Sequence, residues 1–471
     1  MMKEMFAARA AAPGWRALPV RDRMQPIRFV RQLLVRDLDE WIALLGQEAG
    51  KTPMDALTTD LLTVIQAIAY YEKNTAKLLR SRRVRTPLWL AGSSSHIAYE
   101  PCGVAAIIAP WNFPLQLTLI PALAAAAVGN TVLLKPSEKL PLLSKRIAAL
   151  IEEAAFPPGV LQLVEGGQAE AERLIDARPD KLWFTGSEAA GRSVLARAGA
   201  QLIPCVLELG GKDPMIVCAD AHIERAARAA VWGAFLHSGQ VCISVERVYV
   251  HESIYAAFLA AVVAYTRELR QAEGGSWSEI GALATEEGWH KVKRLLDDAV
   301  AKGASIAAGG LPPGAEPPLF PPTVLTGVTE EMQLMQEEIF GPLLPIMAFQ
   351  SEDEVIRLAN ASPYGLSASI FTANRKKGLA LAARLETGSC SINDVVRHIG
   401  NMHLPFGGVK ASGFGRAHGE EGLLAFCRSK SVMVNAGRSS SQINWFPYRE
   451  QAFSGLKQAI GYMYGRRRGR R

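Results

Sequence analysis

The sequence predicts an α/β fold built on parallel sheets that are covered by helices on both faces. Two observations support this prediction. The chain has 471 residues, of which 49% are apolar and 21% charged, a composition typical of a globular protein with a large core. From about residue 104, short apolar runs of strand type alternate with longer segments of helical spacing. Such alternation is typical of βαβ units.

Before this alternation we expect helices and one hairpin. Residues 15–80 show apolar side chains at helical spacing. A β-hairpin is expected at 85–99, because Gly92-Ser93-Ser94-Ser95 separates the apolar runs Leu88-Trp89-Leu90 and Ile97-Ala98-Tyr99.

Two βαβ series then follow along the chain. The first is expected to have strands at 104–109, 132–134, 161–164 and 182–184, with helices at 115–128, 141–154, 168–177 and 188–199. The second is expected to have strands at 215–217 and 245–250, helices at 222–237 and 253–268, and further elements to about 392.

The segment from Pro101 to Leu134 contains no charged residue and is long enough to span a membrane. Three prolines, at 110, 114 and 121, interrupt it, and Trp111-Asn112 lies in its middle. Because proline breaks helices, we interpret the segment as a buried strand, a turn, a helix and a second buried strand.

The net charge of +7 is concentrated at the chain ends. Residues 1–36 carry eight basic and two acidic side chains, and residues 466–471 contain five arginines, so residues 37–465 carry −4. A basic protein would favour nucleic acid or an anionic membrane as partner, but this body is mildly acidic. We therefore predict no nucleic-acid partner.

Cysteine usage predicts a reduced, cytoplasmic protein. The sequence has neither a CxxC pair nor a metal-like Cys/His spacing, so neither a disulfide framework nor a metal site is expected. The N-terminal segment lacks the apolar region of a secretory signal. The six cysteines are at 102, 205, 218, 242, 390 and 427.

Two segments resemble phosphate-binding loops, and we reject both. Residues 46–52, GQEAGKT, have three residues between the glycines where a P-loop has four, and they lie between helical segments instead of after a strand. Gly413-Phe414-Gly415 with Gly419 misses the GxGxxG spacing by one residue.

Two other segments are better placed to bind a nucleotide. Residues 184–191 follow an expected strand and open a helix, where Gly186 permits a tight turn and Ser187 can cap the helix, leaving amides that attract phosphate. Lys135 and Glu138 follow another strand and could hold ribose hydroxyls or form a solvated loop.

Cys242 follows a helical segment and is either a small core residue or a nucleophile. A nucleophile needs an oxyanion donor, which Asn112 could supply from a loop between two prolines. It also needs a base. Glu208 could be a desolvated base because it follows an apolar run, or it could be paired with Lys212.

Seven blocks together resemble the NAD(P)-dependent aldehyde dehydrogenase superfamily, from about Trp15 to Val434. Each block is weak alone, but they occur in family order and spacing, including 34 residues from Glu208 to Cys242. They are PWNFP (110–114), KPSE (135–138), FTGS…G (184–191), ELGGK (208–212), GQVC (239–242), EEIFGP (337–342) and PFGGVKASGFGR (405–416).

The resemblance implies oxidation of an aldehyde to a carboxylic acid. Cys242 would form a thiohemiacetal and then a thioester, Asn112 and the Cys242 backbone N–H would hold the oxyanion, and Glu208 would activate the hydrolytic water. Two alternatives are a CoA-acylating enzyme and a catalytically silent binding protein on the same scaffold.

The resemblance also implies a bound dinucleotide. A carboxylate at Glu138 favours NAD by repelling a 2′-phosphate, although relatives with this block use NADP too. The implied cofactor-binding residues are Ile108, Trp111, Lys135, Ser137, Glu138, Gly186, Ser187, Gly191, Leu209, Glu338 and Phe340.

The family fold implies a Rossmann-type coenzyme domain, an α/β catalytic domain and a small β oligomerisation element, in a homodimer or homotetramer. The boundaries we assign are 1–84, 100–208 and 401–425 for the NAD(P)-binding domain, 209–400 for the catalytic domain, and 85–99 with 426–448 for the oligomerisation element.

Residues 449–471 depart from the family pattern. Phe453, Leu456, Ile460 and Met463 form an amphipathic stripe just before the terminal arginines. This is either a membrane-surface helix with a basic anchor, giving a peripheral membrane location, or a helix packed on the body or a partner subunit.

Overall fold

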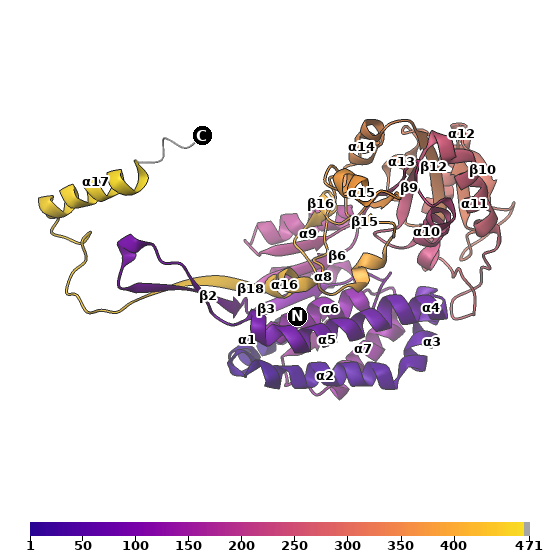
Figure 1. Cartoon of the computed structure of the whole chain (residues 1–471). Helices are drawn as coiled ribbons and strands as arrows, with labels where there is room; N and C mark the ends of the chain where they lie inside the picture. The colour runs from indigo at the N-terminus through magenta and orange to yellow at the C-terminus, as the bar shows by residue number, and fades with distance from the viewer. Residues whose placement is uncertain (466–471) are drawn as a thin grey trace. The chain divides into compact units, whose positions relative to one another are not determined.

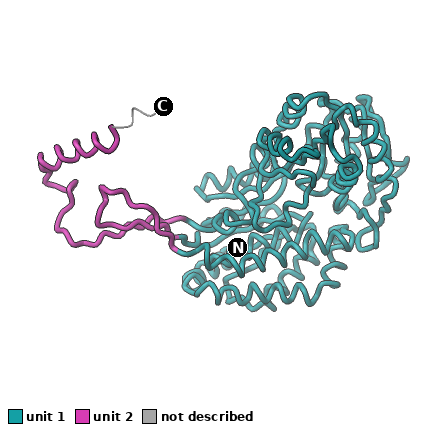
Figure 2. The backbone as a smooth tube through the Cα atoms, viewed as in Figure 1, with its two compact units in different colours: residues 1–80, 99–428 teal, residues 81–98, 429–471 magenta. Residues whose placement is uncertain are grey.

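The computed structural model describes residues 1–465, which form two compact units (Figure 2). Unit 1 contains residues 1–80 and 99–428, and unit 2 contains residues 81–98 and the chain from 429 onward. The terminal arginines of the proposed basic anchor lie outside the described residues.

The first sheet of unit 1 has six strands in the order β17-β7-β6-β3-β4-β5. All neighbouring pairs with a resolved register are parallel except β17 with β7. Every residue of β3 and β4 is buried, as expected of parallel strands covered on both faces. The bounds are β3 Val104–Ile108, β4 Thr131–Lys135, β5 Leu161–Leu163, β6 Lys181–Thr185, β7 Cys205–Glu208 and β17 Gly413–Phe414.

Helices cover this sheet, and the N-terminal helices α2, α3 and α5 lie beside α6 and α7 (Figure 1). The helical region begins earlier than expected, since α1 starts at Met2 in an alanine-rich segment that favours helix. The bounds are α1 Met2–Ala17, α2 Val20–Arg36, α3 Leu38–Ala49, α4 Pro53–Asp55, η1 Ala56–Leu61, α5 Leu62–Leu78, α6 Gln116–Val128, α7 Pro141–Glu153, α8 Gln168–Asp176, α9 Glu188–Gly199 and α16 Gly419–Leu424.

The uncharged segment forms β3, a loop, α6 and β4, as predicted. In α6, all but one of the residues from Gln116 to Val128 are buried, because the helix packs between the sheet and the N-terminal helices. Within residues 1–465, no helix has both the length and the apolar character needed to cross a bilayer.

The second sheet of unit 1 has seven strands in the order β10-β11-β12-β9-β8-β14-β15 and is parallel except at β10. The predicted α/β class is confirmed. The strands are β8 Asp213–Val217, β9 Val245–His251, β10 Ser305–Ala308, β11 Thr323–Thr326, β12 Leu343–Phe349, β14 Ser369–Phe371 and β15 Ser391–Ile392.

The helical segments of this second region are α10 Ile223–Phe235, η3 Leu236–Gly239, η4 Glu252–Ile254, α11 Tyr255–Arg267, α12 Glu286–Ala301, α13 Gln333–Gln336, α14 Glu352–Asn360, α15 Arg375–Ala382 and η5 Arg397–Gly400. A separate two-stranded ladder joins β13 Tyr364–Gly365 and β16 Val409–Lys410.

Unit 2 contains a hairpin, a late strand and the C-terminal helix. The hairpin differs from the prediction, because Leu88–Leu90 forms the 3-10 turn η2 and the strand that pairs with Ile97 is β1, Arg82–Val84. Pro87 explains this difference, since it lacks an N–H for a strand ladder and favours a turn. The remaining elements are β2 Ser93–Pro101, β18 Cys427–Asn435 and α17 Glu450–Tyr464, with strand order β1-β2-β18.

The oligomerisation role of these strands stays a prediction, as do the assigned domain boundaries. The division into compact units keeps the predicted coenzyme and catalytic domains together in unit 1.

A buried ion pair connects three segments of unit 1. Lys51 and Asp60 are both fully buried, with Lys51 Nζ 3.1 Å from Asp60 Oδ2. The other oxygen, Asp60 Oδ1, accepts hydrogen bonds from the backbone N–H groups of Leu115 and Gln116 at 3.0 Å. The Lys51 ammonium is therefore used inside the protein, paired with a carboxylate, and residues 46–52 run from the end of α3 to the start of α4 instead of following a strand, as expected.

Lys51→Met is expected to lower the free energy of unfolding by about 3 to 5 kcal/mol, because it leaves the buried Asp60 carboxylate without its cation. Urea denaturation followed by circular dichroism would measure this change. Lys145→Met, at an exposed position of α7, is the matched control and should change stability by less than about 0.5 kcal/mol. Equal unfolding midpoints for the two variants would contradict the prediction.

Candidate active site

Most of the predicted cofactor-binding residues lie at or just after the carboxyl ends of four neighbouring parallel strands, β3, β4, β6 and β7. Ile108, the last residue of β3, is the register partner of Lys135 at the end of β4. Thr185 at the end of β6 is the partner of Glu208 at the end of β7. Ligands of open α/β sheets bind at this edge. The topology therefore gathers residues that are up to 100 positions apart in sequence.

Lys135 and Glu138 form an ion pair at this edge. Lys135 is buried, and its Nζ donates to Glu138 Oε2 at 3.1 Å, while the Glu138 side chain is half exposed. Burial alone would raise the pKa of Glu138, but hydrogen bonds from its own backbone N–H and from Lys135 hold that pKa below its ordinary value. The carboxylate therefore stays charged and can accept hydrogen bonds from hydroxyl groups. Between them, Ser137 is buried and its Oγ accepts from the Lys139 N–H.

The loop after β6 leads directly into the N-terminus of α9. Ser187 caps this helix, its side chain accepting from the Ala190 N–H at 3.3 Å. A Cβ on Gly191 would lie 2.5 Å from the Leu209 side chain, so glycine is needed for Leu209 to pack against the helix. The four predicted residues Gly186, Ser187, Gly191 and Leu209 therefore lie together where amides and the helix dipole attract an anion.

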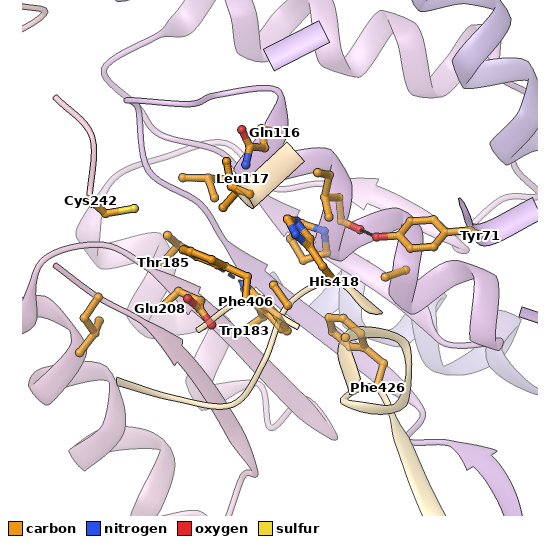
Figure 3. A pocket seen from close by; sticks show the side chains of 17 residues that line it. Tyr71, Gln116, Leu117, Trp183, Thr185, Glu208, Cys242, Phe406, His418 and Phe426 are labelled. Carbon is orange, nitrogen blue, oxygen red and sulfur yellow. Dashed lines mark hydrogen bonds between the residues drawn. The ribbon is translucent and has the colours of Figure 1, made fainter. Parts of the chain in front are cut away.

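Cys242 lies in the loop that leaves α10, after a turn in which His237 and Ser238 have left-handed backbones with φ of 48° and 55°. It lines one pocket together with Glu208 (Figure 3). Burial raises the pKa of the Cys242 thiol well above its ordinary value, and nearby carboxyl groups act in the same direction. The thiol is therefore protonated at neutral pH and needs a base to become a nucleophile.

Glu208 is a buried carboxyl with no hydrogen-bond partner among residues 1–465. Only 6% of the residue is exposed, and neither side-chain oxygen is bonded. Burial raises its pKa well above the ordinary value, and the Arg416 charge opposes this only in part. An unpaired buried carboxylate is costly, so burial favours the protonated form of Glu208, and a shifted carboxyl of this kind is a candidate for proton transfer.

The alternative pairing of Glu208 with Lys212 is wrong. Lys212 Nζ donates to Glu246 Oε2 at 2.8 Å, with both side chains buried. Lys212 lies at the start of β8, in the second sheet, and its partner is on the neighbouring strand β9. Glu208 ends a strand of the first sheet and is left unpaired.

Asn112 contacts the cysteine loop rather than the pocket. It is buried, and its Nδ2 donates to the Gln240 carbonyl at 3.0 Å, two residues before Cys242. It is not among the described residues that line the pocket. An amide has two N–H donors, so one remains for a further acceptor.

Glu338 and Phe340 lie in a loop that meets the glycine pair after Glu208. The Gly211 N–H donates to Glu338 Oε1 at 3.1 Å, and a Cβ on Gly210 would lie 2.5 Å from that carboxyl. Burial raises the pKa of Glu338 to about 7. The Phe340 ring packs edge-on against Trp111, with centroids 5.7 Å apart. Of the predicted cofactor-binding residues, Glu338 therefore contacts the glycine pair, and Phe340 and Trp111 contact each other.

Sequence reasoning missed two buried carboxylates that hold the loops of this site. Glu246 accepts the backbone N–H groups of Ile339 and Phe340 and so fixes the loop of Glu338. Asp55 accepts the His237 N–H at 3.2 Å in the loop before Cys242. The available signal was a charged pair inside a strand, as Glu246-Arg247 is among the valines of β9.

The residues at the strand ends fit a dinucleotide. The capped N-terminus of α9 offers amide donors for a pyrophosphate, and the half-exposed Glu138 carboxylate beside Lys135 suits ribose hydroxyls. Among residues 1–465, no group of three or more His, Cys, Asp or Glu side chains is arranged to hold a metal ion.

Comparisons with known proteins agree with this geometry. Residues 2–432 match the model of the aldehyde dehydrogenase family. The chain is 40% identical to a 4,4'-diapolycopene aldehyde oxidase of Methylomonas sp., with 100% of this chain and 89% of the relative covered. It is 36% identical to a Mycolicibacterium smegmatis protein provisionally named succinate-semialdehyde dehydrogenase [NADP(+)], with 91% and 83% covered.

A solved structure shows the same architecture. The crystal structure of an NAD-dependent aldehyde dehydrogenase from Sinorhizobium meliloti matches with a TM-score of 0.88 and 32% identity, covering 94% of this chain and 88% of that one. From its family match, its relatives and its fold, we conclude that the chain belongs to the aldehyde dehydrogenase family.

Proposed function

We propose that this protein oxidises an aldehyde to a carboxylic acid, with a nicotinamide dinucleotide as the hydride acceptor. The observation that carries the proposal is that a partly buried thiol, Cys242, and an unpaired buried carboxyl, Glu208, line one pocket. A thiol and a base at one cavity are the two groups that acyl transfer to water requires.

In the first half-reaction the thiol proton of Cys242 passes to solvent water as its sulfur adds to the aldehyde carbonyl carbon. The carbon–oxygen π bond breaks, and the oxygen becomes the oxyanion of a thiohemiacetal. The Cys242 backbone N–H and the remaining N–H of Asn112 are the donors assigned to the oxyanion. A dinucleotide held by Glu138 and by the N-terminus of α9 would supply the hydride acceptor that oxidation of this carbon to the thioester level requires.

In the second half-reaction Glu208 takes a proton from a water molecule whose oxygen attacks the thioester carbon. The carbon–sulfur bond breaks, and the products are a carboxylic acid and the restored thiol. Glu208 also supports hydrolysis of the thioester over transfer of the acyl group to CoA. Deacylation by water needs a positioned base, and Glu208 is a candidate for that base. The intact pair of Cys242 and Glu208 opposes the alternative of a catalytically silent protein.

NAD is the cofactor that Glu138 favours, with NADP as the second candidate. The charged Glu138 carboxylate at the strand edge would accept ribose hydroxyls and repel a 2′-phosphate. The relatives' names include both cofactors, so the family alone does not choose between them.

A membrane-surface location for unit 2 also remains a proposal. Its support is the exposure of Phe453, Ile460 and Met463 on α17 and of Trp445 and Phe446 before it. Aromatic and apolar side chains of this kind suit the headgroup region of a bilayer.

Cys242→Ala is expected to abolish aldehyde-dependent NADH formation, because no other group then forms the covalent intermediate. NADH absorbance measures the rate, and retained quenching of protein fluorescence by NAD shows that the variant is folded. Cys102→Ala, a half-buried cysteine outside the pocket, should keep full activity. Turnover by Cys242→Ala above a few per cent would remove Cys242 from its role.

Glu208→Gln is expected to give a normal burst of NADH followed by a steady rate about 100- to 10,000-fold slower. In the native protein the steady rate should rise as the pH rises through the raised pKa of Glu208, since below that pKa the carboxyl is protonated and cannot act as a base. Stopped-flow absorbance across pH 6 to 9 measures both effects. Glu316→Gln, in an exposed loop, is the control, and a full steady rate in Glu208→Gln would overturn the assignment.

Glu138→Gln is expected to shift the cofactor preference toward NADP, because it removes the repulsion and frees the Lys135 ammonium for a 2′-phosphate. The ratio of kcat/KM for NAD to that for NADP should fall at least fivefold. Glu152→Gln, exposed on α7, should leave the ratio unchanged. An unchanged ratio in Glu138→Gln as well would show that this carboxylate does not contact the cofactor.

A further inference from the structure

A large cavity leads from Cys242 to the surface of unit 1. Its volume is about 930 Å³, and its walls come from α5, from the end of α10 and from residues 396–406. A second cavity of about 490 Å³ shares the Met54, Trp232 and Leu236 side chains with it. This space is at the upper end of the range found for small-molecule sites.

The cavity is long because it follows one face of α5. Leu62, Gln66, Ala69 and Lys73 line it at steps of four, three and four residues, and Asn74 is the last residue of α5 that lines it. At 1.5 Å per residue, the stretch from Leu62 to Asn74 spans about 18 Å. An extended chain advances roughly 1.2 Å per bond, so this length corresponds to about 15 bonds, or about 16 carbon atoms.

The walls are mostly apolar, with Gln66 and Lys73 among the polar exceptions, and they are solvent-accessible. Met54, Leu62 and Trp232 are 53%, 43% and 41% exposed although they are large apolar residues. Because exposed apolar side chains that gather in one cavity mark a ligand surface, these walls suit a hydrocarbon chain.

The cavity lacks a buried cation among its described lining residues. Lys73 and Arg397 both line it at exposed positions, and Arg397 lies 3.5 Å from the Asp394 carboxylate. His403 also lines it, with its ring packed edge-on against Tyr70 at 4.8 Å between centroids. A carboxylate on a substrate would therefore meet no buried, fixed cation among these residues, only the exposed side chains of Lys73 and Arg397.

We propose that the substrate of this site is a long, extended, apolar aldehyde, and not a short or carboxylate-bearing one. The inference rests on the proposed aldehyde oxidation. Each methylene buried on the cavity wall raises affinity by up to about fourfold, so specificity should increase with chain length until the cavity is filled.

The test is NADH formation with saturated aldehydes from C3 to C16 and with succinate semialdehyde, at one NAD concentration. The expected result is a kcat/KM for dodecanal at least 100-fold above that for propanal, with succinate semialdehyde below hexanal. A flat series, or a preference for succinate semialdehyde, would overturn the inference. Absence of turnover with every aldehyde would instead contradict the proposed function.

A pair of Ala→Trp variants on α5 locates the chain. Ala69→Trp places an indole in the cavity, whereas Ala76→Trp places one on the exposed face of the same helix, outside the cavity. The ratio of kcat/KM for dodecanal to that for propanal should fall at least tenfold in Ala69→Trp and stay constant in Ala76→Trp. Equal ratios in the two variants would show that the substrate chain does not lie along α5.

Discussion

The arrangement of the active site depends on a small buried network around the Lys51–Asp60 ion pair. Asp60 binds the backbone at the start of α6, three residues after Asn112, and Asp55 binds the backbone of the loop before Cys242. These two loops come from parts of the chain more than 120 residues apart, and the Asn112 side chain connects them directly through its hydrogen bond to Gln240. Since buried charges are costly unless satisfied, this network permits few other arrangements of the two loops.

Two buried carboxyl groups near the site, Glu246 and Glu208, differ in their hydrogen-bond partners, and this difference assigns one a structural role and the other a proposed chemical role. Glu246 is satisfied by Lys212 and by two backbone N–H groups, so its charge is used to hold the loop that carries Glu338. Glu208 has no hydrogen-bond partner among the described residues, and burial keeps its pKa high. The charged form of Glu246 is therefore stabilised by these partners. The charged form of Glu208 is not stabilised by hydrogen bonds, so this carboxyl can gain and lose a proton more readily.

Much of the fold followed from local pattern. The strands at Val104–Ile108 and Thr131–Lys135 and the helix at Gln116–Val128 lie within one or two residues of the expected bounds, because continuous apolar runs and helical spacing are local properties. The hairpin was misplaced, because a single proline at 87 outweighed the apolar character of Leu88–Leu90. The roles of Lys51 and Asp55 were not anticipated, since a charged residue in a helical region usually indicates a solvated face.

The sequence by itself determined the fold class and most of the βαβ order, because periodicity is a local property of the chain. It also proposed the chemical groups, Cys242, Glu208 and Asn112 among them, through their motif spacing. Only the tertiary structure decided which groups are paired. Lys212 is four residues from Glu208 in sequence, yet it bonds Glu246 on the adjacent strand of the second sheet. Which side chains pair, how far they are buried and the long cavity along α5 all depend on contacts between segments distant in sequence. The pKa shifts of Cys242 and Glu208 and the proposed substrate specificity follow from those contacts.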